Sequence, residues 1–165
     1  VKFFGEFVPG TDSWISFSLM KSEQTIRETT KAPLPNSPGY NIGLFFQDYF
    51  PGYKRVQLNL KGVLSGGLPV TIPNKGYEDG YFRTPAYKRV DMGISYQLIE
   101  EDDLIRNRGF FRYLKNAWLG LDVFNLFDMK NVNSYYWITR SDNNQFAVPN
   151  YLTGRQINVR LLIDF

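Results

Sequence analysis

Residues 54–66 read Lys-Arg-Val-Gln-Leu-Asn-Leu-Lys-Gly-Val-Leu-Ser-Gly, and they give the clearest indication of the fold class. Apolar residues take the even positions from Val56 to Leu64, apart from Gly62, and most of the odd positions between them are polar. Successive side chains of a β-strand point to opposite faces, so this alternation predicts a strand with one apolar and one polar face.

The same alternation recurs in three later segments, 86–99, 117–128 and 153–165. One face of the four strands is apolar or aromatic except for a single glycine: Val56, Leu58, Leu60, Gly62, Leu64, Val90, Met92, Ile94, Tyr96, Leu98, Leu119, Leu121, Val123, Ile157, Val159, Leu161, Ile163 and Phe165. The other face is polar or glycine except for Val63 and Leu162: Arg55, Gln57, Asn59, Lys61, Val63, Arg89, Asp91, Gly93, Ser95, Gln97, Gly120, Asp122, Gln156, Asn158, Arg160, Leu162 and Asp164.

Seven segments in all have strand character, and no linker divides the chain into two domains. The predicted strands are 2–8, 13–24, 39–50, 54–66, 86–99, 117–128 and 153–165. Their ends carry Gly, Pro, Asn or Asp, as strand ends do. The sequence therefore predicts one all-β domain, an antiparallel meander of about seven strands over residues 1–165.

The connections between these strands differ in length. Residues 9–12 and 51–53 are short turns, whereas 25–38, 67–85 and 129–152 are long loops rich in Gly, Pro, Asn and Tyr. Alternate connections of a meander lie at opposite ends, so the long loops are expected at one end. The fifth connection, 100–116, breaks this pattern; its acidic start is expected to be a solvated turn rather than a metal site, with a helical turn near 110–116.

Composition excludes several classes of protein. The chain has 165 residues, a mean hydropathy of −0.32, and neither Cys nor His. No 18-residue apolar window exists, which excludes a membrane-spanning helix. The scattered charges, with a net charge of +3, argue against nucleic-acid binding. Without His no Ser-His-Asp arrangement is possible, and the chain is not expected to be an enzyme or to hold a metal or cofactor.

Two classes remain open, a membrane β-barrel and a soluble lipocalin-like ligand-binding barrel. Both have one apolar and one polar face, and the soluble barrel would turn the apolar face inward. Stripes of about nine residues suit a strand that crosses a membrane. Aromatic residues also recur where the stripes end, as in the interfacial girdles of membrane barrels: Trp14, Tyr49, Phe50, Tyr53, Trp118 and Phe165 on the short-turn side, Tyr40, Tyr81, Phe82 and Tyr87 on the loop side.

Three motifs favour the membrane barrel. Residues 122–128, Asp-Val-Phe-Asn-Leu-Phe-Asp, precede the last long loop; residues 85–93, Pro-Ala-Tyr-Lys-Arg-Val-Asp-Met-Gly, open the fifth strand; and the closing run from Pro149 ends on Phe165. In this order they resemble the last part of TonB-dependent outer-membrane receptors. The motifs cover the final 80 residues or so, and the remainder fits by pattern.

This resemblance implies a 22-stranded barrel in the bacterial outer membrane that encloses a plug domain, takes energy through TonB, and imports iron chelates, cobalamin, glycans or peptides. The chain departs from the family in having no plug, no segment that contacts TonB and only part of the strands. Residues 1–10 show no leader and become a strand almost at once, so we expect a section of a larger protein. Its partners would be the remaining strands, the plug domain, TonB through that plug, and outer-membrane lipid.

Four charged residues are the candidate site. Arg89, Asp91, Asp122 and Arg160 share the polar face, and we expect them to face the lumen and form a polar network. An acid–base role for the two aspartates is disfavoured, because the arginines beside them favour structural ion pairs. The imported substrate stays unidentified at this stage, since the long loops and the plug would select it.

Overall fold

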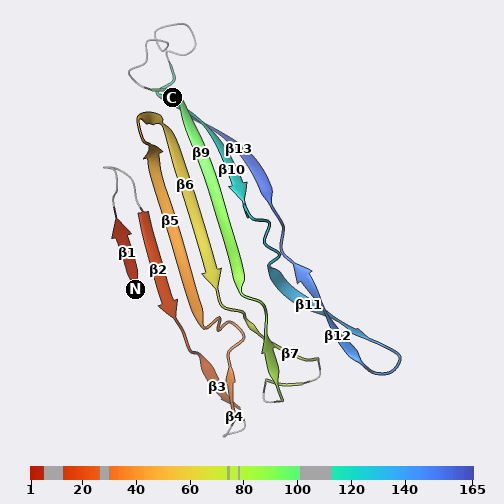
Figure 1. Cartoon of the computed structure of the whole chain (residues 1–165). Coiled ribbons are helices and arrows are strands. Elements are labelled where there is room, and N and C mark those ends of the chain that lie inside the picture. Colours follow the sequence, from red (N-terminus) through yellow and green to blue (C-terminus); the bar gives the residue numbers. More distant parts are fainter. Residues whose placement is uncertain (6–12, 27–29, 74, 78, 101–112) are drawn as a thin grey trace.

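A computed structural model describes residues 1–5, 13–26, 30–73, 75–77, 79–100 and 113–165. All of its elements in these ranges are strands, and seven of them form one antiparallel sheet in the order β1-β2-β5-β6-β9-β10-β13 (Figure 1). They are β1 (Lys2–Gly5), β2 (Ser13–Leu19), β5 (Tyr40–Phe50), β6 (Tyr53–Ser65), β9 (Tyr87–Ile99), β10 (Asn116–Phe124) and β13 (Gln156–Asp164). The predicted all-β class and the seven-stranded antiparallel sheet are confirmed.

Six further strands form three separate hairpins, which the sequence analysis treated as loops. They are β3 (Glu23–Ile26) with β4 (Thr30–Pro33), β7 (Pro69–Thr71) with β8 (Tyr81–Arg83), and β11 (Val132–Thr139) with β12 (Gln145–Tyr151). The long loops predicted at 25–38, 67–85 and 129–152 therefore contain strands that the alternation did not predict. All three hairpins lie at the same end of the sheet (Figure 1), where the long connections were expected.

Several predicted strand ends also need correction. The segment 13–24 is not one strand, because β2 ends at Leu19 and Glu23 already belongs to β3. The segment 117–128 ends as a strand at Phe124, where Asn125 takes a positive φ of 52° that strands do not adopt. The last strand begins at Gln156 rather than at residue 153. Residues 6–8, the turn at 9–12 and residues 101–112 of the fifth connection lie outside the described residues. The helical turn predicted near 110–116 is wrong at its end, because Asn116 already begins β10.

The register places the two predicted faces as the alternation required. Leu58 pairs with Ile94, and Leu121 pairs with both Ile94 and Val159, so one apolar row crosses four strands. The neighbouring row on the other face joins Asn59, Gly93, Asp122 and Asn158. The apolar face continues into the first strands, where Ile15 pairs with Leu44 and with Phe3.

The aromatic girdles fit the register only in part. Trp14 pairs with Phe45, which pairs with Lys61, so Trp14 lies on the polar face and stacks on Phe45 there at 6.1 Å. Tyr49, Trp118 and Tyr87 lie on that face too, by their pairs with Gln57, Leu162 and Ser65. The prediction that these four residues belong to a girdle around the apolar face is wrong. Nearness to a strand end does not determine on which face of the sheet an aromatic side chain lies.

The sheet is a single layer, and its apolar face is uncovered in the described structure. Ile94 lies on a strand with neighbours on both sides and still exposes 43% of its surface; Val159 on the edge strand β13 exposes 68%. Apart from Pro33 and Pro69, the buried apolar side chains among those described are Ala32, Ile99, Leu114 and Ala117, and the last three cluster where β9 leads toward β10. Within the described residues no helix is long and apolar enough to span a membrane.

Candidate functional site

The polar face of the sheet holds the four candidate residues. They stand on β9, β10 and β13, on the side opposite Leu121 and Leu161. Two glycines in the middle of this face leave space that side chains of the neighbouring strands occupy. A Cβ at Gly93 would collide with the side chains of Asp122 and Asn59, and a Cβ at Gly120 would lie 3.3 Å from the Arg160 Nε. Small residues at these points allow charged groups of adjacent strands to approach one another.

Arg89 and Asp91 form the tighter pair. The Arg89 Nε donates to Asp91 Oδ1 at 2.7 Å, and the backbone N–H of Asn125 donates to the same oxygen at 2.8 Å. The Arg89 guanidinium also lies over the ring of Phe124, 5.6 Å from its centroid. Asp91 thereby connects β9 to the turn that follows β10. Its side chain is 17% exposed, so these charge-assisted bonds are partly screened from water.

Asp122 and Arg160 form a looser pair. The Arg160 Nη2 lies 3.9 Å from Asp122 Oδ1, and it donates a long hydrogen bond of 3.5 Å to the Ser95 hydroxyl. The Asp122 side chain is 14% exposed and that of Arg160 is 43% exposed. At this distance the pair has Coulomb attraction without a short hydrogen bond.

The four residues thus form two pairs. Among the described residues, no hydrogen bond or ion pair joins the Arg89–Asp91 pair to the Asp122–Arg160 pair. Beside the second pair lies a recess of about 170 Å³ on the same face, lined by Gln57, Ser95, Trp118, Gly120, Arg160 and Leu162. The arrangement presents an arginine and a serine hydroxyl to whatever covers this face. Among the residues that the structure describes there, it offers polar contacts and no nucleophile paired with a base.

Asn125 is a key residue that the sequence analysis quoted in a motif without a role. It is 2% exposed, and its side-chain amide donates to the carbonyl of Met129 at 3.0 Å while its carbonyl accepts the Met129 N–H at 2.9 Å. Three residues later Asp128, also at a positive φ of 52°, accepts the N–H of Arg155 at 2.9 Å. The Asn and Asp of the motif therefore build the exit from β10. Asn and Asp are the non-glycine residues that tolerate this conformation best.

Asn131 is a second residue that the sequence analysis missed. It is 6% exposed and bonds both backbone groups of Lys88: its carbonyl accepts the Lys88 N–H at 2.8 Å, and its amide donates to the Lys88 carbonyl at 2.8 Å. A side-chain amide here takes the place of a partner strand at the start of β9. The backbone carbonyl of Asn131 accepts the N–H of Leu152, which closes the base of the last hairpin.

The hairpin end of the molecule is held together through β8. One nitrogen of Arg83, Nη1, donates to the carbonyls of Ser37 and Gly67, both at 2.8 Å. Phe82 makes edge-to-face contacts with Tyr135 at 5.2 Å and Trp137 at 6.2 Å between ring centroids. Strand β8 thus joins the segment before β5 to the β11–β12 hairpin.

Gly66 and Gly67 belong to the same junction. A Cβ at Gly66 would overlap the carbonyl of Pro38, and a Cβ at Gly67 would overlap the carbonyl of Thr84. The glycine pair therefore serves close backbone packing between connections. The outer face of the β11–β12 hairpin remains exposed beyond this junction, with Tyr136, Ile138, Phe146 and Val148 side by side in register. Arg140 lies over the Phe146 ring at 5.3 Å.

The chain was compared with family models, with curated proteins and with solved structures, and nothing in any of the three matches it.

Proposed function

We propose that this chain forms part of the wall of an outer-membrane β-barrel, the C-terminal section of a TonB-dependent receptor that imports a bulky nutrient. One observation carries the proposal: an apolar face that crosses all seven strands is uncovered, and the opposite face is polar. Soluble monomers rarely expose apolar surface on this scale, whereas a barrel wall turns such a face to lipid.

Strand length supports the same reading. The central strands β5, β6 and β9 have 11, 13 and 13 residues, and β10 and β13 have 9 each. A tilted strand needs about 9–11 residues to cross the hydrocarbon of a bilayer. Strands of soluble proteins are most often about 5–6 residues long.

The connections give further support. Between β5 and β6 the chain turns within Pro51 and Gly52, where Gly52 has a φ of 81°. The opposite end carries all three hairpins (Figure 1). Bacterial outer-membrane barrels have short turns on the periplasmic side and long loops outside. The hairpin end would accordingly face the exterior and meet the nutrient first.

In this proposal the polar face, with Arg89, Asp91, Asp122 and Arg160, faces the barrel lumen. The edges of β1 and β13 pair with the remaining strands of a 22-stranded barrel, and a plug domain covers the polar face and receives energy through TonB. The cargo is an iron chelate, cobalamin, a glycan or a peptide, as the motifs at 85–93 and 122–128 imply. The chain acts as a binding and conducting wall rather than as an enzyme.

Spin labels test the orientation of the two faces. The sequence has no Cys, so single cysteines at 157–163 can carry a nitroxide without background labelling. In phosphatidylcholine vesicles, labels at Ile157, Val159 and Leu161 should be relaxed most by oxygen dissolved in the lipid. Labels at Asn158 and Arg160 should be relaxed most by a water-soluble nickel complex. Relaxation by nickel at 157, 159 and 161 and by oxygen at 158 and 160 would contradict the proposal. So would a soluble chain that does not bind the vesicles, which would favour the lipocalin-like barrel.

The transport role needs whole cells that make the complete receptor. Collapse of the proton gradient should stop uptake of the nutrient while its binding at the cell surface persists, because the energy for release would come through TonB. Uptake that continues at the same rate without the gradient would contradict the TonB-dependent role and leave the membrane location unaffected.

A further inference from the structure

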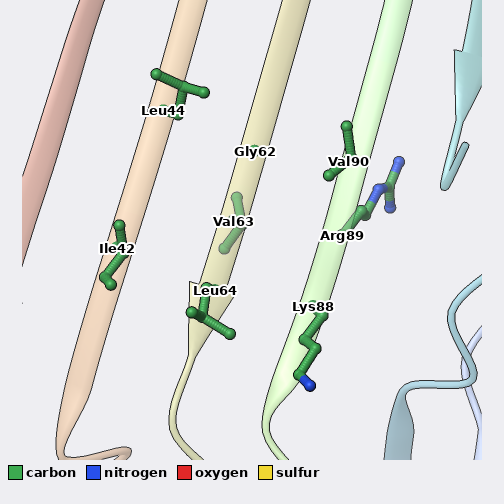
Figure 2. Close-up of a pocket in the computed structure, with 8 residues that line it drawn as sticks. All are labelled: Ile42, Leu44, Gly62, Val63, Leu64, Lys88, Arg89 and Val90. Atoms are coloured by element: carbon green, nitrogen blue, oxygen red, sulfur yellow. The ribbon is translucent and has the colours of Figure 1, made fainter. Parts of the chain in front are cut away.

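The apolar face has a groove near its hairpin end. It has a volume of about 270 Å³, crosses β5, β6 and β9, and is lined by Ile42, Leu44, Gly62, Val63, Leu64, Lys88, Arg89 and Val90 (Figure 2). The side chains that stand on the apolar face here are aliphatic, with one exception. That exception is Lys88, which pairs with Leu64 across β6 and β9.

Gly62 creates the groove. It pairs with Leu44 on one side and Val90 on the other, so a missing side chain leaves a gap in an otherwise continuous apolar row. Its backbone has no positive φ that would require glycine. A Cβ at this position would lie 3.5 Å from the Leu44 Cβ, an ordinary contact. Neither the backbone conformation nor the packing requires a glycine here. The consequence of the glycine is that the apolar surface has an open space at this position.

Lys88 supplies a cation at the mouth of the groove. Figure 2 shows its side chain running from β9 toward the end where β6 leaves the sheet. The two bonds between its backbone and Asn131 fix the position from which the side chain starts. Among the described residues, no carboxylate lies within ion-pair distance of the ammonium.

We propose that this groove binds a phosphate-bearing membrane lipid, with an acyl chain along Gly62 and the phosphate on the Lys88 ammonium. The inference rests on the proposed function, since the groove meets lipid only if the apolar face does. An aliphatic channel that ends at the Lys88 ammonium complements a lipid with an anionic head and an apolar tail. A lysine near the end of a spanning segment reaches the headgroup level, where it attracts anionic lipid.

The test uses the whole chain in phosphatidylcholine vesicles with spin-labelled phosphatidic acid or spin-labelled phosphatidylcholine as probes. The spectrum gives the fraction of each lipid that the protein immobilises. The wild-type chain should prefer phosphatidic acid. Lys88→Gln should lower that preference about fivefold, the factor that corresponds to one lysine at an anionic surface. Gly62→Val, which fills the groove, should lower the immobilised fraction of both lipids.

Lys61→Gln is the matched control, because Lys61 is next to Gly62 in sequence and lies on the opposite face. This variant should leave the immobilised fractions of both spin-labelled lipids unchanged. Equal preference in the wild type, or unchanged preference in Lys88→Gln, would overturn the site while the chain still floats with the vesicles. So would an unchanged immobilised fraction in Gly62→Val. Failure of the wild-type chain to float with vesicles would instead overturn the proposed function together with the site.

Discussion

Asp91 and Asp122 are both aspartates on the polar face beside an arginine, and their contacts differ. Asp91 accepts two short bonds, one from Arg89 and one from the backbone N–H of Asn125. Asp122 has Arg160 at 3.9 Å. The common parity of the four candidate residues was visible in the sequence. Their division into two pairs was not, because it depends on register and on the turn after Phe124.

Replacement of the two aspartates should separate these roles. Asp91→Ala should lower the free energy of unfolding by about 2 kcal/mol, since it leaves the N–H of the nearly buried Asn125 without its acceptor. Asp122→Ala should cost less than about 1 kcal/mol, as a loose ion pair does. Urea titrations of the chain folded in detergent micelles measure both. Equal losses in the free energy of unfolding would show that the Asp91 contacts stabilise the fold no more than the Asp122 contacts do.

Asn125 and Asn143 give a second comparison, because both have positive φ, 52° and 62°. Asn143 is exposed in the turn between β11 and β12, whereas Asn125 is buried and bonds Met129 twice. Each Asn→Ala variant should lose about 1–2 kcal/mol from the backbone conformation. Asn125→Ala should lose a further 1–3 kcal/mol or so from unpaired polar groups. The same micelle titration checks this, and a larger loss at Asn143 would refute it.

Among the strands, those with long period-two patterns could be predicted from sequence, and the short ones could not. β6 and β9 have 13 residues each, and the alternation runs through most of that length, from Val56 to Leu64 and from Arg89 to Leu98, so it predicted both the strand and its faces. Strands β3, β4, β7 and β8 have only three or four residues, too few for a period to show.

The β11–β12 hairpin had a signal that could have been used. Aromatic and β-branched residues from Tyr135 to Thr139 are followed by a polar turn and then by Phe146 to Val148. Pro149 within the second run made it look like a loop, although an edge strand tolerates proline. The aromatic positions were harder, because the face of Trp14 depends on pairing with Phe45 rather than on nearness to a strand end.

The aromatic contact between hairpins predicts a local effect. Phe82→Ala should remove the contacts to Tyr135 and Trp137 and loosen the hairpin end without loosening the sheet. Amide hydrogen exchange should become faster in β7, β8, β11 and β12 and stay unchanged in β6 and β9. Tyr136→Ala is the control, since Tyr136 lies on the other face of β11 and is 63% exposed. Faster exchange throughout the large sheet would contradict the local role of Phe82.

For the whole chain, the two faces of β13 offer the sharpest contrast between lipid and water. Val159 and Asn158 are adjacent, on opposite faces, and both exposed. If the apolar face meets lipid, Val159→Arg should cost about 2–4 kcal/mol near the membrane midplane. Asn158→Arg should cost little, because residue 158 pairs with Asp122 on the polar face.

Folding titrations in phosphatidylcholine vesicles compare these two variants with the unchanged chain. Similar small losses for both would mean that the apolar face stays in water. Similar large losses would mean that both faces are buried, as in a closed soluble barrel whose polar face packs against another domain.

We propose that the uncovered apolar face meets lipid. The sheet has two open edges, β1 and β13, and unpaired edge groups are templates for further pairing. Soluble monomers rarely keep open edges and an apolar face of this size exposed to water. Static light scattering of the isolated 165-residue chain at micromolar concentration in plain buffer, with and without detergent, tests this most directly. We expect aggregates or edge-to-edge assemblies in buffer, which detergent disperses; a stable monomer without detergent would contradict the contact of the apolar face with lipid.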